Sequence, residues 1–248
     1  MLSPAQQWLH PPLRRNRTLT THRIIAIGDI HGCLAALEAL LAAIRPQADD
    51  TLVALGDYVD RGPDSRGVIE RLLRLKQQCH LVPLLGNHDD MMLKVYDGQR
   101  QLYIDWLMYG GNTTLESYGA LDLEEIPATH IEFLRECRLF CESYHHIYVH
   151  ANYRADLPLH AQPREMLLWE PVKARQPGPH CSGKTAIVGH STQKGGEILD
   201  LGYLKCIDTW CYGEGWLTAL DVETGQVWQA NKNGKMKGEQ RGAGNWGS

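Results

Sequence analysis

Short apolar segments alternate with longer amphipathic segments over the first 90 residues of the chain. The apolar segments lie at residues 23–27, 51–55 and 80–85. Their length and composition predict buried β-strands, and residues 33–44 place leucines on one face of a predicted helix. Asp64 is the predicted N-cap of a second helix, which is expected to end near Gln78. Strands that alternate with helices in this way predict a parallel sheet with right-handed crossovers.

The pattern changes after residue 90. Residues 91–143 are predicted to form a mostly helical insertion, which includes the loop YGGNTTLESYG. Strands resume at residues 144–151 and 185–190, and the C-terminal third is rich in predicted strands. The last two of these are joined by a hairpin-like turn at ETG.

We expect one α/β domain over residues 23–231. Residues 1–22 carry no structural signal and are predicted to be a flexible N-terminal segment. Residues 232–248 lack apolar periodicity and are predicted to be a disordered tail.

The composition is that of a globular protein with a small net charge. The 248 residues are 43% hydrophobic and 22% charged, and the formal net charge is −4. General nucleic-acid and membrane-surface binders are usually basic, so we expect neither activity. No segment approaches the roughly 18 consecutive apolar residues of a membrane helix, and the N-terminal residues lack the apolar core of a secretory signal. The seven cysteines show neither a CxxC pair nor zinc-finger spacing. These features predict a soluble, cytoplasmic protein with free thiols.

Chemically versatile side chains follow five of the predicted strands, at the point where each strand ends. They are Asp29 and His31 in GDIHG, Asp57, Asp60 and Arg61 in GDYVDRG, Asn87 and His88 in GNHDD, His150 in VHAN, and His190 in VGHST. Ligands of open α/β sheets bind beyond the carboxyl ends of the strands, so we expect these side chains to lie together.

Six of these side chains offer an oxygen or nitrogen ligand to a metal ion. They are Asp29, His31, Asp57, Asn87, His150 and His190. The set suits manganese, iron or zinc rather than calcium, and structural zinc would favour thiolates. Six ligands exceed the need of one catalytic ion but suit two ions if one carboxylate bridges them. The sequence therefore predicts a site for two divalent ions, with manganese as the first choice.

Glycines immediately precede several of the candidate ligands. They are Gly28, Gly56, Gly86 and Gly189. A residue without Cβ allows a sharp turn, and we expect it to let the ions approach closely.

The motifs GDIHG, GDYVDRG and GNHD, followed by the later histidines, resemble the signature of a known family. The chain is similar to the phosphoprotein phosphatase family of calcineurin-like metallophosphoesterases, especially its bacterial and phage serine/threonine phosphatases. The resemblance covers about residues 24–192 and includes LLWEP at 167–171. It implies a metallophosphoesterase fold, in which central mixed β-sheets form a β-sandwich flanked by helices.

The resemblance also implies roles for individual residues. Asp29 and His31 would hold the first ion, Asp57 would bridge both ions, and the second would be completed by Asn87, His150 and His190. A water that bridges the ions would attack phosphorus directly, without a covalent phosphoenzyme.

The alternative mechanism, in which a cysteine attacks phosphorus, does not fit the sequence. A cysteine nucleophile would need the loop C-x5-R, and Cys33 is followed by the helical sequence LAALEA instead.

Three further residues would act on the substrate. The family pattern implies that His88 is the general acid, with Asp60 fixing its tautomer through a hydrogen bond. Arg61 would bind the phosphate, because a planar guanidinium can meet two phosphoryl oxygens. Members of the family usually add a second phosphate-binding arginine, for which Arg175 is the candidate.

The substrate is left open by the sequence. Phosphorylated proteins are the first choice, on serine, threonine or tyrosine, and dinucleoside tetraphosphates are the alternative. A nucleotide enzyme should present aromatic or basic residues of the insertion at the mouth of the site, and Tyr103, Trp106 and Tyr109 are candidates. A non-catalytic scaffold would be expected to lack a ligand or the acid, and none is missing. The oligomeric state is not predicted.

Overall fold

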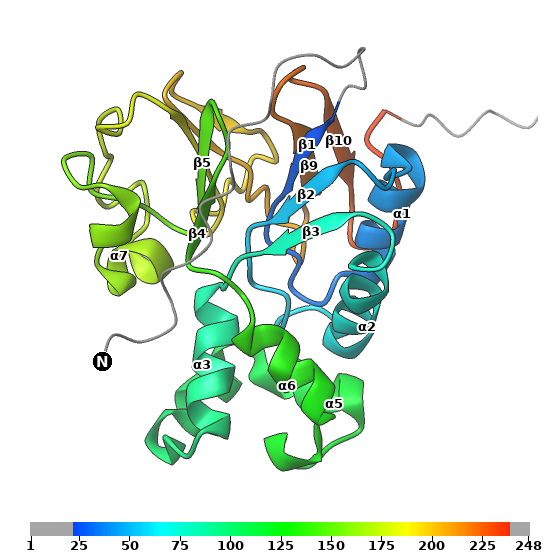
Figure 1. Cartoon of the computed structure of the whole chain (residues 1–248). Helices are drawn as coiled ribbons and strands as arrows, with labels where there is room; N and C mark the ends of the chain where they lie inside the picture. Colours follow the sequence, from blue (N-terminus) through cyan, green and yellow to red (C-terminus); the bar gives the residue numbers. More distant parts are fainter. Residues whose placement is uncertain (1–21, 239–248) are drawn as a thin grey trace, which may run out of the picture.

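Two β-sheets pack face to face, and helices cover their outer faces (Figure 1). The computed structural model describes residues 22–238. The strands of the first sheet are β1 (Ile24–Ile27), β2 (Thr51–Ala54), β3 (His80–Pro83), β9 (Leu217–Asp221) and β10 (Val227–Ala230). Those of the second are β4 (Phe140–Glu142), β5 (His146–Val149), β6 (Thr185–Val188), β7 (Leu199–Asp200) and β8 (Leu204–Cys206). Their orders are β10-β9-β1-β2-β3 and β4-β5-β6-β8-β7.

Both sheets are mixed. β1, β2 and β3 are parallel, as the alternation of strands and helices predicts, but β9 and β10 add to this sheet in antiparallel register. In the second sheet β5, β6 and β8 are parallel, whereas β4 and β7 pair antiparallel at the two edges. The expectation of a mixed β-sandwich is confirmed, and the predicted hairpin joins β9 to β10.

Side chains from both sheets form the core between them. Ala26, Val53 and Leu55 of the first sheet pack with Tyr148 and Ile187 of the second. These positions alternate with residues that face the helices, as period-2 side-chain geometry requires. Apolar burial on both faces explains why the strands read as continuous hydrophobic segments.

Two helices cover the outer face of the first sheet. They are α1 (Leu34–Ile44) and α2 (Ser65–Leu75). The predicted N-cap is confirmed, because the Asp64 carboxylate accepts a hydrogen bond from the Gly67 amide at 2.7 Å. On the other side of the molecule, α7 (Arg164–Trp169) packs against the second sheet (Figure 1).

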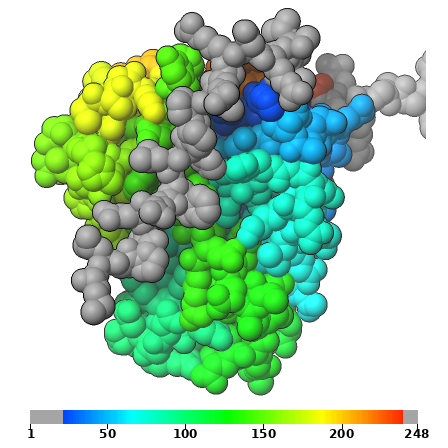
Figure 2. All heavy atoms as spheres, in the orientation of Figure 1, coloured from blue at the N-terminus to red at the C-terminus, as the bar shows by residue number. Residues whose placement is uncertain are grey.

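The insertion forms a helical lobe at one end of the sandwich. Its elements are α3 (Asn87–Tyr96), η1 (Arg100–Leu102), α4 (Tyr103–Trp106), η2 (Leu107–Gly111), α5 (Asn112–Tyr118), η3 (Leu123–Glu125) and α6 (Ala128–Arg135). Figure 2 shows this lobe in green at the bottom of the molecule, below the parts of the chain that form the two sheets. The expected loop YGGNTTLESYG is instead a π-helical turn followed by α5, and the predicted range 91–143 ends in strand β4.

Other sequence expectations meet the structure in part. The predicted tail starts too early, because residues 232–238 turn back on β10 and Met236 forms a β-bridge with Ala230. The predicted flexible segment and the remainder of the tail lie outside the described residues, apart from His22. All seven cysteines are among the described residues and are unpaired. Within residues 22–238, none of the helices combines the length and hydrophobicity that a membrane crossing requires.

Candidate metal centre and active site

The loops that follow five strands meet at one edge of the two sheets. β1, β2 and β3 contribute from the first sheet, and β5 and β6 from the second. The structure brings together all six predicted ligands: Asp29, His31, Asp57, Asn87, His150 and His190. All but His190 are at most 5% exposed.

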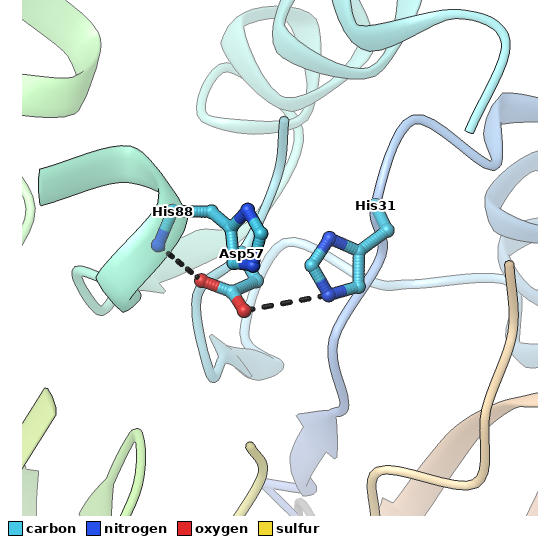
Figure 3. Close-up of side chains that lie close together, drawn as sticks. All are labelled: His31, Asp57 and His88. Carbon is cyan, nitrogen blue, oxygen red and sulfur yellow. Dashed lines mark hydrogen bonds and ion pairs between the residues drawn. The ribbon is translucent and has the colours of Figure 1, made fainter. Parts of the chain in front are cut away.

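Asp57 lies at the centre of this group. Its Oδ2 is 3.4 Å from Nε2 of His31, a contact drawn in Figure 3, and its Oδ1 is 3.6 Å from Nε2 of His150. The two oxygens of one carboxylate thus face two different groups of ligand atoms. This is the arrangement required of a carboxylate that bridges two ions.

Three acceptor atoms converge on the His150 side of Asp57. Nε2 of His150 and Nδ1 of His190 lie 3.0 and 2.9 Å from Oδ1 of Asn87. The other ring nitrogens donate to the carbonyls of Leu55, at 2.8 Å, and Trp169, at 3.1 Å. These bonds assign the ring protons to the far side, so lone pairs face the amide oxygen. Atoms at right angles and about 2.1 Å from one ion lie about 3 Å apart, so the group fits a cation.

The His31 side of Asp57 offers a second group of acceptors. Nδ1 of His31 donates to the Val59 carbonyl at 3.0 Å, which leaves a lone pair on Nε2. Oδ2 of Asp29 accepts from the His190 amide at 2.9 Å, whereas its buried Oδ1 has no hydrogen-bond partner among the described residues. An unpartnered buried carboxylate oxygen is costly unless a cation or proton satisfies it.

Burial and mutual contacts shift the pKa values of several of these groups. Burial lowers the pKa of His31 well below its usual value and, together with His150, lowers the pKa of His190 to about 4, so both imidazoles are neutral. Burial opposes ionisation of Asp57, but attraction to the adjacent His150 and His88 imidazoles outweighs it and lowers the pKa of Asp57. Burial and the nearby Asp208 and Asp57 carboxylates raise the pKa of Asp29 well above its usual value, which marks a place where positive charge is favourable.

The backbone is unusual at the same positions. Among the described residues, seven non-glycine residues have a positive φ, and five of them belong to the predicted site: His31, Asp57, Asp60, Arg61 and His190. Such conformations cost free energy and concentrate at functional sites. The tight loops direct these side chains toward one another.

Two of the glycines allow carboxylates, rather than ions, to approach. A Cβ on Gly86 would lie 2.1 Å from Oδ1 of Asp57, and one on Gly189 would lie 2.0 Å from Oδ1 of Asp29. We expected these glycines to make room for the ions. Instead, each makes room for the carboxylate of a candidate ligand.

His88 and Asp60 form a buried pair next to Asp57. Nδ1 of His88 is 2.7 Å from Oδ2 of Asp60. The His88 amide donates to Oδ1 of Asp57 at 3.0 Å, a contact drawn in Figure 3. The His88 and His31 rings meet edge to face, with centroids 4.8 Å apart. Burial raises the pKa of Asp60, and the hydrogen bonds from His88 and Thr114 oppose this shift. The pair thus has the contact expected of a carboxylate that fixes a histidine tautomer.

Several residues that hold the site were missed in the sequence. The Asp89 carboxylate accepts from the amides of Asp57, Tyr58 and Gly86 at 2.8 to 3.0 Å, so it secures the loop after β2 to the start of α3. Its position three residues after Gly86, at the start of a helix, is a capping signal that could have identified it. Of the three aromatic candidates, Trp106 is fully buried, Tyr103 packs beside it and is half-buried, and Tyr109 is exposed.

Of the two predicted phosphate-binding arginines, Arg61 contacts the site through its side chain, whereas Arg175 is linked to a site loop through its backbone. The Arg61 guanidinium lies 4.7 Å from the centre of the Tyr212 ring and donates to Nε2 of His31 at 3.0 Å. A metal ion on this nitrogen would replace that hydrogen bond. The Arg175 side chain is exposed, and its carbonyl accepts from Nδ2 of the buried Asn152 at 2.9 Å. Asn152 therefore ties the loop that carries Arg175 to the loop that carries His150.

Comparison with known proteins agrees with this geometry. The profile of the calcineurin-like phosphoesterase family matches residues 22–213. The chain is 36% identical over 135 residues to serine/threonine-protein phosphatase 1 of Salmonella typhimurium, over 52% of this chain and 58% of that protein. It is 33% identical over 157 residues to a symmetrical bis(5'-nucleosyl)-tetraphosphatase of Janthinobacterium sp., over 62% of this chain and 51% of that protein. The chain thus spans little more than half the length of either relative.

A solved structure supports the same assignment. A protein provisionally described as a diadenosine tetraphosphatase superposes with a TM-score of 0.64 and 28% identity, over 85% of this chain and 94% of that one. A cold-active protein-tyrosine phosphatase of a Shewanella species has the same fold, with a TM-score of 0.63 and 17% identity over 87% of this chain and 80% of that one. The fold, the metal-fitting cluster and the match over most of the chain lead to one conclusion: the chain belongs to the calcineurin-like phosphoesterase family.

Proposed function

We propose that this chain is a dinuclear-metal phosphatase that hydrolyses phosphate monoesters, with phosphorylated proteins as its first candidate substrates. The observation that carries the proposal is the convergence of unprotonated ligand atoms on both sides of Asp57, next to the His88–Asp60 pair. The serine/threonine phosphatase among its relatives supports the choice of substrate.

The six ligands would divide between two ions. Asp29 and His31 would hold the first, Asp57 would bridge, and the second would be completed by Asn87, His150 and His190. Two divalent ions, when bound, supply the positive charge that activates a water and neutralises phosphoryl oxygens. Manganese is our first choice, with iron and zinc as alternatives, because the ligand set is oxygen and imidazole nitrogen.

The remaining residues would act on the substrate. Nδ1 of His88 is hydrogen-bonded to Asp60, which leaves Nε2 of His88 to give a proton to the leaving oxygen as the ester bond breaks. Arg61, held against the Tyr212 ring, would bind two phosphoryl oxygens through its guanidinium. The exposed Arg175 would be the second phosphate-binding group.

The proposal is tested with the full chain, stripped of metal and then given manganese. Hydrolysis of p-nitrophenyl phosphate and of a phosphoseryl peptide should depend on manganese and should disappear with EDTA. Activity that persists in the metal-free protein, or no turnover of either substrate with manganese, iron or zinc, would contradict it.

Hydrolysis of dinucleoside tetraphosphates is the second candidate function, and a pocket beside the site favours it. The pocket has a volume of about 300 Å³, and its lining includes Lys94, Tyr109 and Trp169. It adjoins the site, because the Trp169 carbonyl accepts from His190 and the Tyr109 and His88 rings have centroids 6.4 Å apart. The two aromatic rings in this lining suit a nucleobase.

The two substrates can be separated in one experiment. Diadenosine tetraphosphate and the phosphoseryl peptide are compared with manganese, in the wild type and in Tyr109→Ala and Trp169→Ala. A nucleotide enzyme should hydrolyse diadenosine tetraphosphate in preference to the peptide. Both substitutions should raise the KM for diadenosine tetraphosphate and leave hydrolysis of p-nitrophenyl phosphate nearly unchanged. A preference for the peptide would reject this candidate.

A further inference from the structure

The helical insertion reaches into the active site through two buried side chains. Nε1 of Trp106, at the end of α4, donates to the Asp60 carboxylate at 3.1 and 3.2 Å, and Oγ1 of Thr114, in α5, donates to Oδ1 of Asp60 at 2.7 Å. Trp106, Thr114 and Asp60 are all 0% exposed. With His88, three donors therefore surround one carboxylate that water cannot reach.

Thr114 also fixes the backbone of Asp60. The Asp60 amide donates to Oγ1 of Thr114 at 2.9 Å, so one hydroxyl bonds both the main chain and the carboxylate of the same residue. Asp60 has a φ of 69°, a conformation that needs such support in a residue other than glycine.

The turn between α4 and α5 is shaped around these contacts. A Cβ on Gly111 would lie 2.3 Å from the Trp106 ring, so only glycine leaves room for the indole. Gly110 has a φ of 112°, and its carbonyl accepts from the Arg61 amide at 3.2 Å. The WLMYGGNTT segment thus fits closely against both Asp60 and Arg61, and the proposed function assigns no role to its Trp106 or Thr114.

We propose that Trp106 and Thr114 are positioning residues, which hold the Asp60 carboxylate in place and directed at Nδ1 of His88. The inference rests on the proposed function of His88 as the proton donor. A buried carboxylate that loses one of its donors is left partly unsatisfied and free to rotate away from His88. The insertion would then determine how effectively the enzyme expels poor leaving groups.

The experiment compares phenyl phosphate, whose leaving group needs a proton, with 2,4-dinitrophenyl phosphate, whose leaving group does not. Thr114→Val and Trp106→Phe should each lower kcat for phenyl phosphate about 10-fold and change kcat for the dinitrophenyl ester less than about 2-fold. Thr114→Ser keeps the hydroxyl and should restore the wild-type ratio.

Thr113→Val is the matched control. Its hydroxyl donates to the Gly110 carbonyl at 2.8 Å in the same turn and is not among the hydrogen-bond partners of Asp60, so any loss should be equal for both esters. Equal effects of Thr114→Val on the two esters, or no effect, would overturn the inference.

His88→Asn distinguishes failure of the inference from failure of the proposed function. If His88→Asn loses activity selectively on phenyl phosphate and Thr114→Val does not, only the inference is wrong. If His88→Asn lowers both rates equally, the proton-donor assignment is wrong and the inference is overturned with it.

Discussion

The direction of each imidazole ring determines what the candidate site can bind. His31, His150 and His190 each give one ring proton to a backbone carbonyl, at Val59, Leu55 and Trp169. The partners lie 28, 95 and 21 positions away in the chain, so no local sequence pattern could reveal them. The residue types were predictable from the sequence, but the tautomers, and hence the lone pairs, required the fold.

Replacement of His88 tests the proton-donor assignment at this scale. His88→Asn should bind manganese as the wild type does but hydrolyse a phosphoseryl peptide about 100-fold more slowly, because the leaving oxygen lacks a proton. His145→Asn, at an exposed histidine outside the site, is the control and should be fully active. Unchanged turnover by His88→Asn would refute the assignment.

Acid should destabilise the metal-free protein in part through His190. Its pKa is about 4 in the folded protein, below the value of about 6.5 in an unfolded chain, so the unfolded state binds more protons between these values. The resulting stability is present above about pH 6.5 and is lost as the pH falls toward 4.

Urea unfolding with EDTA at pH 7 and pH 5 measures this contribution. Between pH 7 and pH 5, the free energy of unfolding should fall by about 1 kcal/mol more in the wild type than in His190→Gln. This value is reduced to allow for solvent screening of the partly exposed His190 ring. His145→Gln should behave as the wild type does. Equal losses in the wild type and His190→Gln would show that His190 is not held neutral.

At the scale of elements, the strand ends were the most predictable feature. β1, β2 and β3 are parallel and end together, so polar residues after each strand had to meet. The insertion was harder to predict, because Trp106 and Thr114 look like ordinary helix residues until their contacts with Asp60 are seen. The glycine pair in the same segment suggested a loop, whereas it permits close packing within a helical turn.

The glycine before His190 provides a test of how closely these elements must fit. Gly189→Ala should reduce manganese binding and activity by at least about 10-fold, because its Cβ would lie 2.0 Å from Oδ1 of Asp29. Gly195→Ala, in the same loop, has no atom within 4 Å of the added Cβ and should leave both unchanged. Full manganese occupancy in Gly189→Ala, measured by metal analysis, would contradict the steric argument.

At the scale of the whole molecule, the candidate site joins the two sheets. Asp29, His31 and Asp57 come from the first sheet, whereas His150 and His190 follow strands of the second. The sequence predicted these strands and the candidate ligands, and the family resemblance implied a β-sandwich, but neither indicated which strands belong to which sheet. Which strands pair depends on contacts between distant segments, such as Ala26 and Ile187 in the core, and these contacts have no local signal.

Crystals soaked in manganese and measured near the manganese absorption edge test the central claim most directly. We predict two anomalous peaks, one on each side of the Asp57 carboxylate, with His31 beside one and Asn87, His150 and His190 around the other. A single peak, peaks elsewhere on the molecule, or two ions without Asp57 between them would contradict the account.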